Sequence, residues 1–287
     1  MGSAILNGLL EATRNIPNPP IRTFIVSTKT SASAERLHAT LHAADKDRVR
    51  FTPNDNLTAM ANADIILLAC KPFLAESILS QSGVWDAAKN KLIISVMAGP
   101  TIAQILGYMR PCSRGSGPKG EGEVEYAESP APTVVRVQPN VAARLRQSMT
   151  VVEVDDSSEG EEGLQAKGTV EWIFKQVGEV QFVAPSVFDV SALLVGASMA
   201  WGAVALDGVL DGCVAGGLRR PEALEMAAQT LAGMAALLKD GVHPAVLREG
   251  ISSPRGCTIQ GILELERAGV RGSFADALLK GVEHLQK

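Results

Sequence analysis

The first half of the chain alternates short apolar runs with segments of helical periodicity. The apolar runs are rich in Val, Ile and Leu, which is typical of strands buried on both faces of a parallel sheet. The segments between them fit crossover helices, so the pattern predicts an α/β fold built from βαβ units. Strands are expected at residues 23–26, 63–70, 91–96, 134–137 and 149–152, and a helix at 34–43.

From Ser186 the periodicity is helical to the end of the chain. Helices are expected at residues 206–214, 221–239 and 258–268, with Pro221 in a first turn, where proline is favoured. This half is rich in Ala and Gly and has few large side chains with which to fill a core. We expect its helices to pack against another copy of the chain, which predicts a homo-oligomer.

Two segments depart from these patterns. Residues 111–133 are rich in Gly, Pro, Ser and charges of both signs, which predicts a disordered surface insertion. Residues 190–206 carry no charge and reach the lower length limit of a membrane helix. They lack flanking Lys or Arg and are dense in small residues, so a core helix of a soluble protein is the favoured interpretation.

Composition narrows the class of protein. At about 150 residues per domain, the 287 residues suggest two domains. A net charge of −4 and a pI near 5.7 give no basic field, so we expect no nucleic-acid partner. The cysteines have neither disulfide nor zinc-site spacing, which predicts a reduced intracellular compartment and no metal site; they are Cys70, Cys112, Cys213 and Cys257.

The first helix and the end of the first strand have features of a dinucleotide site. Gly2 opens an apolar helix, as the last glycine of a G-x-G-x-x-G turn does, although a single glycine is a weak signal. Ser27, Thr28 and Lys29 follow the strand, at the point where NAD-selective folds carry an acid. Hydroxyls and a cation suit a 2′-phosphate, which favours NADP over NAD. An ordinary polar loop is the alternative.

Other predicted strands also end on polar or flexible residues. In parallel sheets, ligands bind at the carboxyl ends of the strands. Besides Ser27, these ends carry Lys71, Gly99 and Asn140. We therefore expect the binding edge of the sheet to include them.

The strongest local cluster of polar residues runs from Ser252 to Ile259. Its hydroxyls and a glycine stand at the start of a predicted helix, where free backbone N–H groups and the positive dipole end suit a carboxylate or phosphate. The alternative is an ordinary N-cap, which Ser and Thr also favour. Three hydroxyls and a glycine exceed what one cap needs, so we favour a site. The preceding His243 is interpreted as a turn residue.

Together these segments resemble the pyrroline-5-carboxylate reductase family. The resemblance covers almost the whole chain and is most specific at residues 252–259, where the family signature lies. It rests on residues 1–5, Asn56, 63–65, 69–72, 95–102, 136–140, His243-Pro244, 252–259, Gly261 and 265–269.

The resemblance implies a function for each half of the chain. The activity would be hydride transfer from NAD(P)H to the imine carbon of 1-pyrroline-5-carboxylate, giving L-proline, in a cytoplasmic enzyme. Residues 1–184, with the insertion at 111–133, would form a Rossmann-like dinucleotide-binding domain. Residues 185–287 would form an all-α domain for substrate binding and dimerisation. The partners would be a cyclic imine carboxylate and another copy of the chain, with no membrane.

The resemblance also assigns site residues. Thr258 would be catalytic, and Ser253, Gly256, Cys257 and Thr258 would bind the substrate carboxylate and the region of the ring nitrogen. Positioning would supply most of the rate, because the cofactor carries the hydride chemistry. The residues expected to bind the cofactor are Gly2, Ser27, Thr28, Asn56, Ala69, Lys71, Ala98 and Gly99.

The chain departs from the family pattern at several positions. It begins inside the phosphate-binding turn, so the first strand and first two glycines are expected to be missing. Met199 replaces a proline, Arg255 replaces a glycine and adds a cation, and an acid before His243 is absent. Two alternatives therefore stand beside a proline-forming reductase. One is a truncated, inactive member acting as a binding or assembly subunit, and the other is a reductase of another imine or keto acid.

Overall fold

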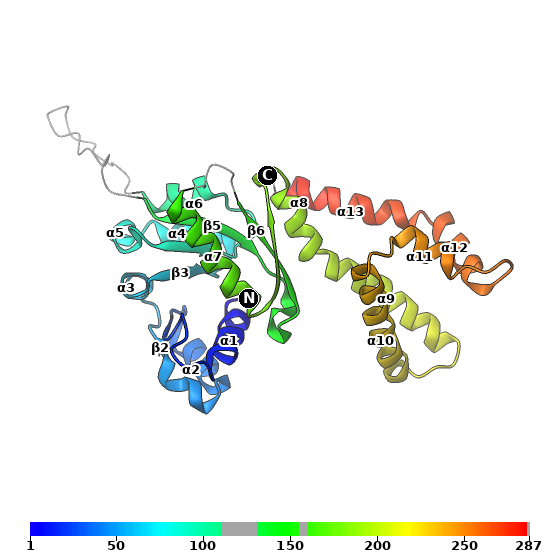
Figure 1. Cartoon of the computed structure of the whole chain (residues 1–287), viewed down its shortest axis with the longest axis horizontal. Helices are drawn as coiled ribbons and strands as arrows, with labels where there is room; N and C mark the ends of the chain where they lie inside the picture. The colour runs from blue at the N-terminus through cyan, green and yellow to red at the C-terminus, as the bar shows by residue number, and fades with distance from the viewer. Residues whose placement is uncertain (111–130, 155–159, 286–287) are drawn as a thin grey trace. The chain divides into compact units, whose positions relative to one another are not determined.

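The chain folds into two compact units. The computed structural model describes residues 1–110, 131–154 and 160–285. Its units are Met1–Gly196, which is α/β, and Ala197–Leu285, which is helical, and each is described by itself (Figure 1). The predicted fold class, a Rossmann-like α/β part followed by an all-α part, is confirmed.

The strands of the first unit form two sheets. Among the described residues, β1 and β2 form a parallel pair, and a five-stranded sheet has the order β3-β4-β5-β6-β7. Sequential order is what short βαβ connections produce. The strands are β1 (Phe24–Val26), β2 (Val49–Phe51), β3 (Ile65–Leu68), β4 (Leu92–Ser95), β5 (Thr133–Gln138), β6 (Ser148–Glu153) and β7 (Gly178–Val183).

One strand differs from the predicted parallel arrangement. β6 runs antiparallel to β5, with Val137 opposite Val152. The connection between these strands runs only from Pro139 to Gln147, whereas a parallel crossover needs about a dozen residues or more. A short connection therefore reverses the chain direction. β7 is again parallel to β6.

The structure tests the predicted insertion at residues 111–133 only at its C-terminal end, residues 131–133. Residues 111–130 lie outside the described residues. Thr133 does not belong to an insertion, because it is the first residue of β5 and pairs with Leu92 of β4.

Helices cover both faces of the five-stranded sheet. Val151 and Val152 are consecutive in β6 and therefore point to opposite faces. Val152 packs with α1 and α7, whereas Val151 packs with α8. Met60, Leu79, Val84 and Ile105 come from α3 to α6 and join the cluster on residues of β3, β4 and β5. The helices of this unit are α1 (Gly2–Thr13), α2 (Ser31–Thr40), η1 (Ala43–Arg48), α3 (Asn56–Asn62), η2 (Pro72–Leu74), α4 (Ala75–Leu79), α5 (Val84–Ala88), α6 (Ile102–Met109), η4 (Val141–Leu145), α7 (Glu161–Lys175) and α8 (Pro185–Val195).

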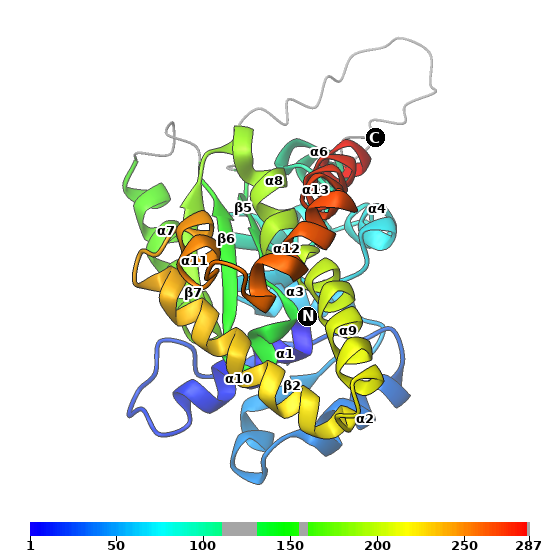
Figure 2. The ribbon, with the colours of Figure 1, turned by 90° about the vertical axis from the view of Figure 1, so that its right-hand side faces the viewer.

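The second unit has little core of its own. Of its described hydrophobic residues, Leu210 and Ala223 are the buried ones, whereas Val204 is 75% and Met226 60% exposed. α9 contacts α10, and α12 contacts α13 (Figure 2). The helices are α9 (Ser198–Ala215), α10 (Arg220–Lys239), α11 (Pro244–Gly250), α12 (Cys257–Arg267) and α13 (Val270–Leu285).

The apolar stretch Pro185–Ala215 has the length and composition of a membrane span, and its most apolar 18-residue window has a mean hydropathy of 1.7. One such stretch is weak evidence for a membrane protein. It consists of two helices, because α8 ends at Val195 and α9 begins at Ser198.

Candidate functional site

The start of α1 lies against the end of β3. A Cβ added to Gly2 would lie 3.0 Å from the Cβ of Ala69, which is tighter than ordinary contact. α1 has no side-chain cap and no acid in its first turn. Its first N–H groups are therefore available to an anion such as a pyrophosphate. Gly2 and Ala69, both predicted to bind the cofactor, are brought together here.

A second pair of predicted cofactor residues is joined by a hydrogen bond. The Oγ of Ser27, after β1, lies 2.8 Å from Oδ1 of Asn56 and 3.1 Å from the carbonyl oxygen of Thr52. Asn56 is the first residue of α3. The adjacent Asp55 caps that helix by accepting from the N–H of Thr58 at 2.9 Å, and this hydrogen bonding lowers the pKa of Asp55. Asp55, the acidic residue next to Asn56, is thus engaged by its own helix.

The segment after Ser27 presents hydroxyls and cations at the start of α2. Thr30 caps α2 by accepting from the N–H of Ser33, and its own Oγ lies 3.0 Å from the Ser33 Oγ. Arg36 donates from Nη2 to the same Ser33 oxygen at 3.1 Å. Sequence reasoning missed Arg36. The sequence feature that could have identified Arg36 is its position three residues after Ser33, because residues three apart on a helix are neighbours.

The loops after β3 and β4 form another junction. Cys70 Sγ lies 3.4 Å from Met97 Sδ, and burial raises the pKa of the Cys70 thiol. Next to these residues, Lys71 and Ala98 are exposed. Gly99 has a φ of 102°, a conformation that favours glycine. The predicted cofactor residues of both loops therefore lie at neighbouring strand ends, as expected for parallel β3 and β4.

Asn140, at the end of β5, has a structural task. Its Nδ2 donates to the carbonyl oxygen of Val195 at 3.0 Å, and its Oδ1 accepts from the N–H of Ala142. The residue is buried. Asn140 thus ties the end of β5 to the end of α8, although sequence reasoning placed it at the ligand-binding edge.

The N-terminus of α12 is open. Gly256 is its N-cap residue, and no side chain caps it. A Cβ at Gly256 would lie 2.5 Å from the Ser253 Oγ and 3.1 Å from the Ser253 carbonyl oxygen, so any larger residue would displace the Ser253 side chain. Among the described residues, the hydroxyls of Ser253 and Thr258 have no hydrogen-bond partner, in contrast to the Ser252 Oγ, which donates to the carbonyl oxygen of Arg248 at 2.7 Å. The ordinary N-cap interpretation therefore does not apply.

The neighbouring His243 is a cap. Its Nδ1 accepts from the N–H of Ala245 at 3.2 Å at the start of α11. The described part of the chain has no group of three or more His, Cys, Asp or Glu that could hold a metal ion.

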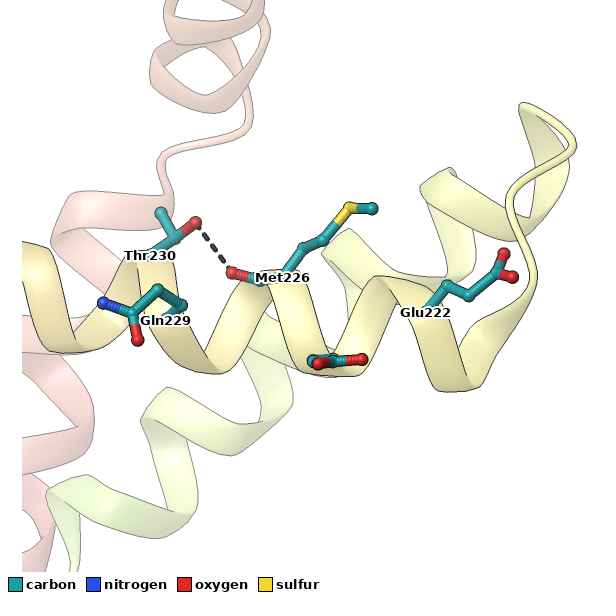
Figure 3. Close-up of a pocket in the computed structure, with 5 residues that line it drawn as sticks. Glu222, Met226, Gln229 and Thr230 are labelled. Atoms are coloured by element: carbon teal, nitrogen blue, oxygen red, sulfur yellow. Dashed lines mark hydrogen bonds between the residues drawn. The ribbon is translucent and has the colours of Figure 1, made fainter.

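The two sets of predicted residues belong to different units. The cofactor set lies within Met1–Gly196, and the substrate set lies within Ala197–Leu285. A surface hollow of about 580 Å³ in the second unit contains neither set (Figure 3). It runs along α10, where Thr230 Oγ donates to the carbonyl oxygen of Met226 at 2.9 Å.

Comparisons with known proteins cover both units. Residues 1–99 match the family profile of coenzyme F420-dependent NADP oxidoreductases, and residues 185–287 match that of pyrroline-5-carboxylate reductase dimerisation. The pyrroline-5-carboxylate reductase of Lophium arboricola is 38% identical over 97% of this chain and 87% of the relative. The chain belongs to the pyrroline-5-carboxylate reductase family. The Neurospora crassa enzyme of the same name is 35% identical with the same coverage.

Solved structures of pyrroline-5-carboxylate reductases share the fold. The enzyme from Streptococcus pyogenes has a TM-score of 0.77 at 22% identity, covering 100% of this chain and 94% of that one. The enzyme from Plasmodium falciparum, solved with NADP bound, has a TM-score of 0.77 at 20% identity, covering 100% and 93%.

Family membership decides several of the expectations. The chain is an oxidoreductase of the pyrroline-5-carboxylate reductase family, and the N-terminal profile supports NADP as its cofactor. The dimerisation profile supports self-association, in agreement with the sparse core of the second unit. Relatives of this family are soluble enzymes, which favours a soluble protein over a membrane protein. The alternative of an inactive assembly subunit is not favoured.

Proposed function

We propose that this chain reduces 1-pyrroline-5-carboxylate to L-proline with NADPH, NADH being the poorer donor. The observation that carries the substrate assignment is the open N-terminus of α12, where Ser253 and Thr258 hydroxyls have no partner among the described residues. An anionic substrate suits such a helix end, because free N–H groups and the helix dipole both favour negative charge.

The first unit fits the nicotinamide cofactor by its chemistry. The start of α1 is uncapped and free of acids, and Gly2 keeps it close to β3. Ser27 and Thr28 follow β1, and Asp55, the acid next to Asn56 in sequence, is held by its own helix. Asn56, Ala69, Lys71, Ala98 and Gly99 complete the proposed set. Arg36 adds a cation that suits a 2′-phosphate.

The mechanism assigns binding and orientation to the protein. The α12 N–H groups, with Ser253, Gly256 and Cys257, bind the substrate carboxylate. The Thr258 hydroxyl donates a hydrogen bond toward the ring nitrogen and keeps its own proton. The proton that this nitrogen gains as the imine is reduced comes from solvent. When bound, the reduced nicotinamide supplies the hydride to the imine carbon. The residues of α12 thereby hold the imine in a reactive orientation, which is the larger source of rate.

The organisation of the protein follows from these roles. Residues 1–184 form the dinucleotide-binding domain, and 185–287 form the domain for substrate binding and dimerisation. The enzyme works as a homodimer or larger oligomer in the cytoplasm, without nucleic-acid or membrane partners. Its acidic net charge of −4 supports the absence of nucleic acid.

The direct test is an assay of the purified chain with NADPH and 1-pyrroline-5-carboxylate. NADPH consumption with stoichiometric appearance of L-proline is expected. NADPH binding without any turnover of this imine would contradict the proposed activity.

A further inference from the structure

The loop before α12 includes the proposed substrate residues Ser253 and Gly256. It also contains an arginine in a backbone conformation that favours glycine. The N–H of Gly256 donates to the carbonyl oxygen of Ser253 at 3.0 Å, which closes a turn with Pro254 and Arg255 at its centre. Arg255 has a φ of 60°. Turns with proline in the second position and positive φ in the third favour glycine or asparagine there. The local backbone therefore gives no reason for an arginine.

The charge of Arg255 is uncompensated. Three other arginines between α11 and α13 each have a glutamate partner: Arg248 and Arg271 pair with Glu266, at 3.3 and 3.1 Å, and Arg267 pairs with Glu264. Arg255 is exposed and has no ion pair or hydrogen bond from its side chain among the described residues. Arg255 directly precedes Gly256, the N-cap residue of α12, and lies three residues before Thr258 in the sequence, at the end of the helix where the dipole is positive.

We infer that Arg255 is a specificity-determining residue that selects cyclic imines bearing a carboxylate over uncharged ones. This inference rests on the proposed function. A guanidinium with free donors attracts a carboxylate and can form charge-assisted hydrogen bonds with it. Its effect is on substrate binding, because the charge of the carboxylate does not change as the imine is reduced. Removal of the guanidinium therefore raises KM and leaves kcat in place.

Arg255→Gly is the informative variant, because glycine suits the observed φ and the turn is expected to form at least as well. Arg255→Lys keeps a positive charge without the guanidinium fork. Arg267→Ala removes a paired arginine from the C-terminal end of α12 and serves as the control for net charge.

The experiment compares steady-state kinetics for 1-pyrroline-5-carboxylate and uncharged 1-pyrroline at low and high salt. For Arg255→Gly we expect a KM for the carboxylate substrate about three- to tenfold higher, the range of one solvent-exposed hydrogen bond or ion pair. The kcat and the KM for 1-pyrroline stay within about twofold of wild type on the same reasoning. Wild type loses affinity for the carboxylate substrate as salt rises, and Arg255→Gly loses this dependence. Arg255→Lys retains part of the effect, and Arg267→Ala behaves as wild type.

Two results would overturn the inference in different ways. An unchanged KM for the carboxylate substrate in Arg255→Gly, or an equal change for both imines, refutes the role of Arg255 while the reductase activity stands. A wild-type enzyme that reduces neither imine refutes the proposed function and this inference together.

Discussion

Ser27 and Asn56 are 29 residues apart in sequence, and their side chains meet with Ser27 Oγ 2.8 Å from Asn56 Oδ1. The first follows β1 and the second begins α3. Their contact joins the loop after β1 to the start of α3, in the part of the first unit that we assign to the cofactor.

Replacement of Asn56 by alanine tests the cofactor assignment. Loss of the amide removes one of the two hydrogen-bonding partners of the Ser27 hydroxyl, the other being the carbonyl oxygen of Thr52, and a polar group proposed to line the dinucleotide. We expect the KM for NADPH to rise about two- to tenfold, the range of one hydrogen bond, with the substrate KM unchanged. Asn62→Ala is the matched control, because Asn62 lies on the same helix and donates to the carbonyl oxygen of Thr58. Equal effects of both variants would contradict the assignment.

Arg36 should distinguish NADPH from NADH. Its guanidinium lies one turn into α2, within 3.1 Å of the Ser33 Oγ. Arg36→Ala is expected to raise the KM for NADPH about three- to tenfold and to leave that for NADH nearly unchanged, since only NADPH carries the 2′-phosphate. Steady-state kinetics with both cofactors measure this. Lys89→Ala, which removes a cation paired with Asp86, is the control. A parallel loss with both cofactors would rule out contact with the phosphate.

A buried ion network should stabilise the first unit. Arg136 of β5 lies 2.7 Å from Glu153 and 3.0 Å from Asp189, and its guanidinium stacks 4.4 Å from the centre of the Phe188 ring. Arg136→Ala leaves Glu153 buried without this partner. We expect the free energy of unfolding to fall by about 3 kcal/mol, measured by urea denaturation. The exposed pair of Lys89 provides the comparison, and its removal should change stability little. A loss no larger than that of Lys89→Ala would show that the network is not stabilising.

The longer features of the fold could be predicted from the sequence. Apolar runs identified five strands, and helical periodicity identified the C-terminal unit. β2 and β7 were missed because their residues alternate instead of forming apolar runs. In β7, Glu179 and Gln181 are exposed between partly buried neighbours, as suits the last strand in the order of a sheet. The direction of β6 could have been inferred from the short connection that precedes it.

The site residues could be predicted from the sequence where the polar groups that form a binding site are close together along the chain. The cluster from Ser252 to Thr258 and the hydroxyls after β1 could be read from neighbouring residues. The contact of Ser27 with Asn56 required the fold, because it joins distant segments. Asn140 was assigned to the ligand edge because strand ends often bind ligands, and its bond to Val195 depends on the packing of α8, which no local pattern reveals.

The central claim is that the open start of α12 binds and orients the imine, with Thr258 acting directly on it. The most direct measurement compares kcat/KM for 1-pyrroline-5-carboxylate in wild type, Thr258→Ala and Thr258→Ser, with NADPH binding followed separately by fluorescence titration. Thr230→Ala, whose hydroxyl donates to the carbonyl oxygen of Met226, is the control. We predict that Thr258→Ala lowers kcat/KM by about tenfold or more, that serine restores most of it, and that NADPH affinity is unchanged. Wild-type turnover in Thr258→Ala would contradict the account.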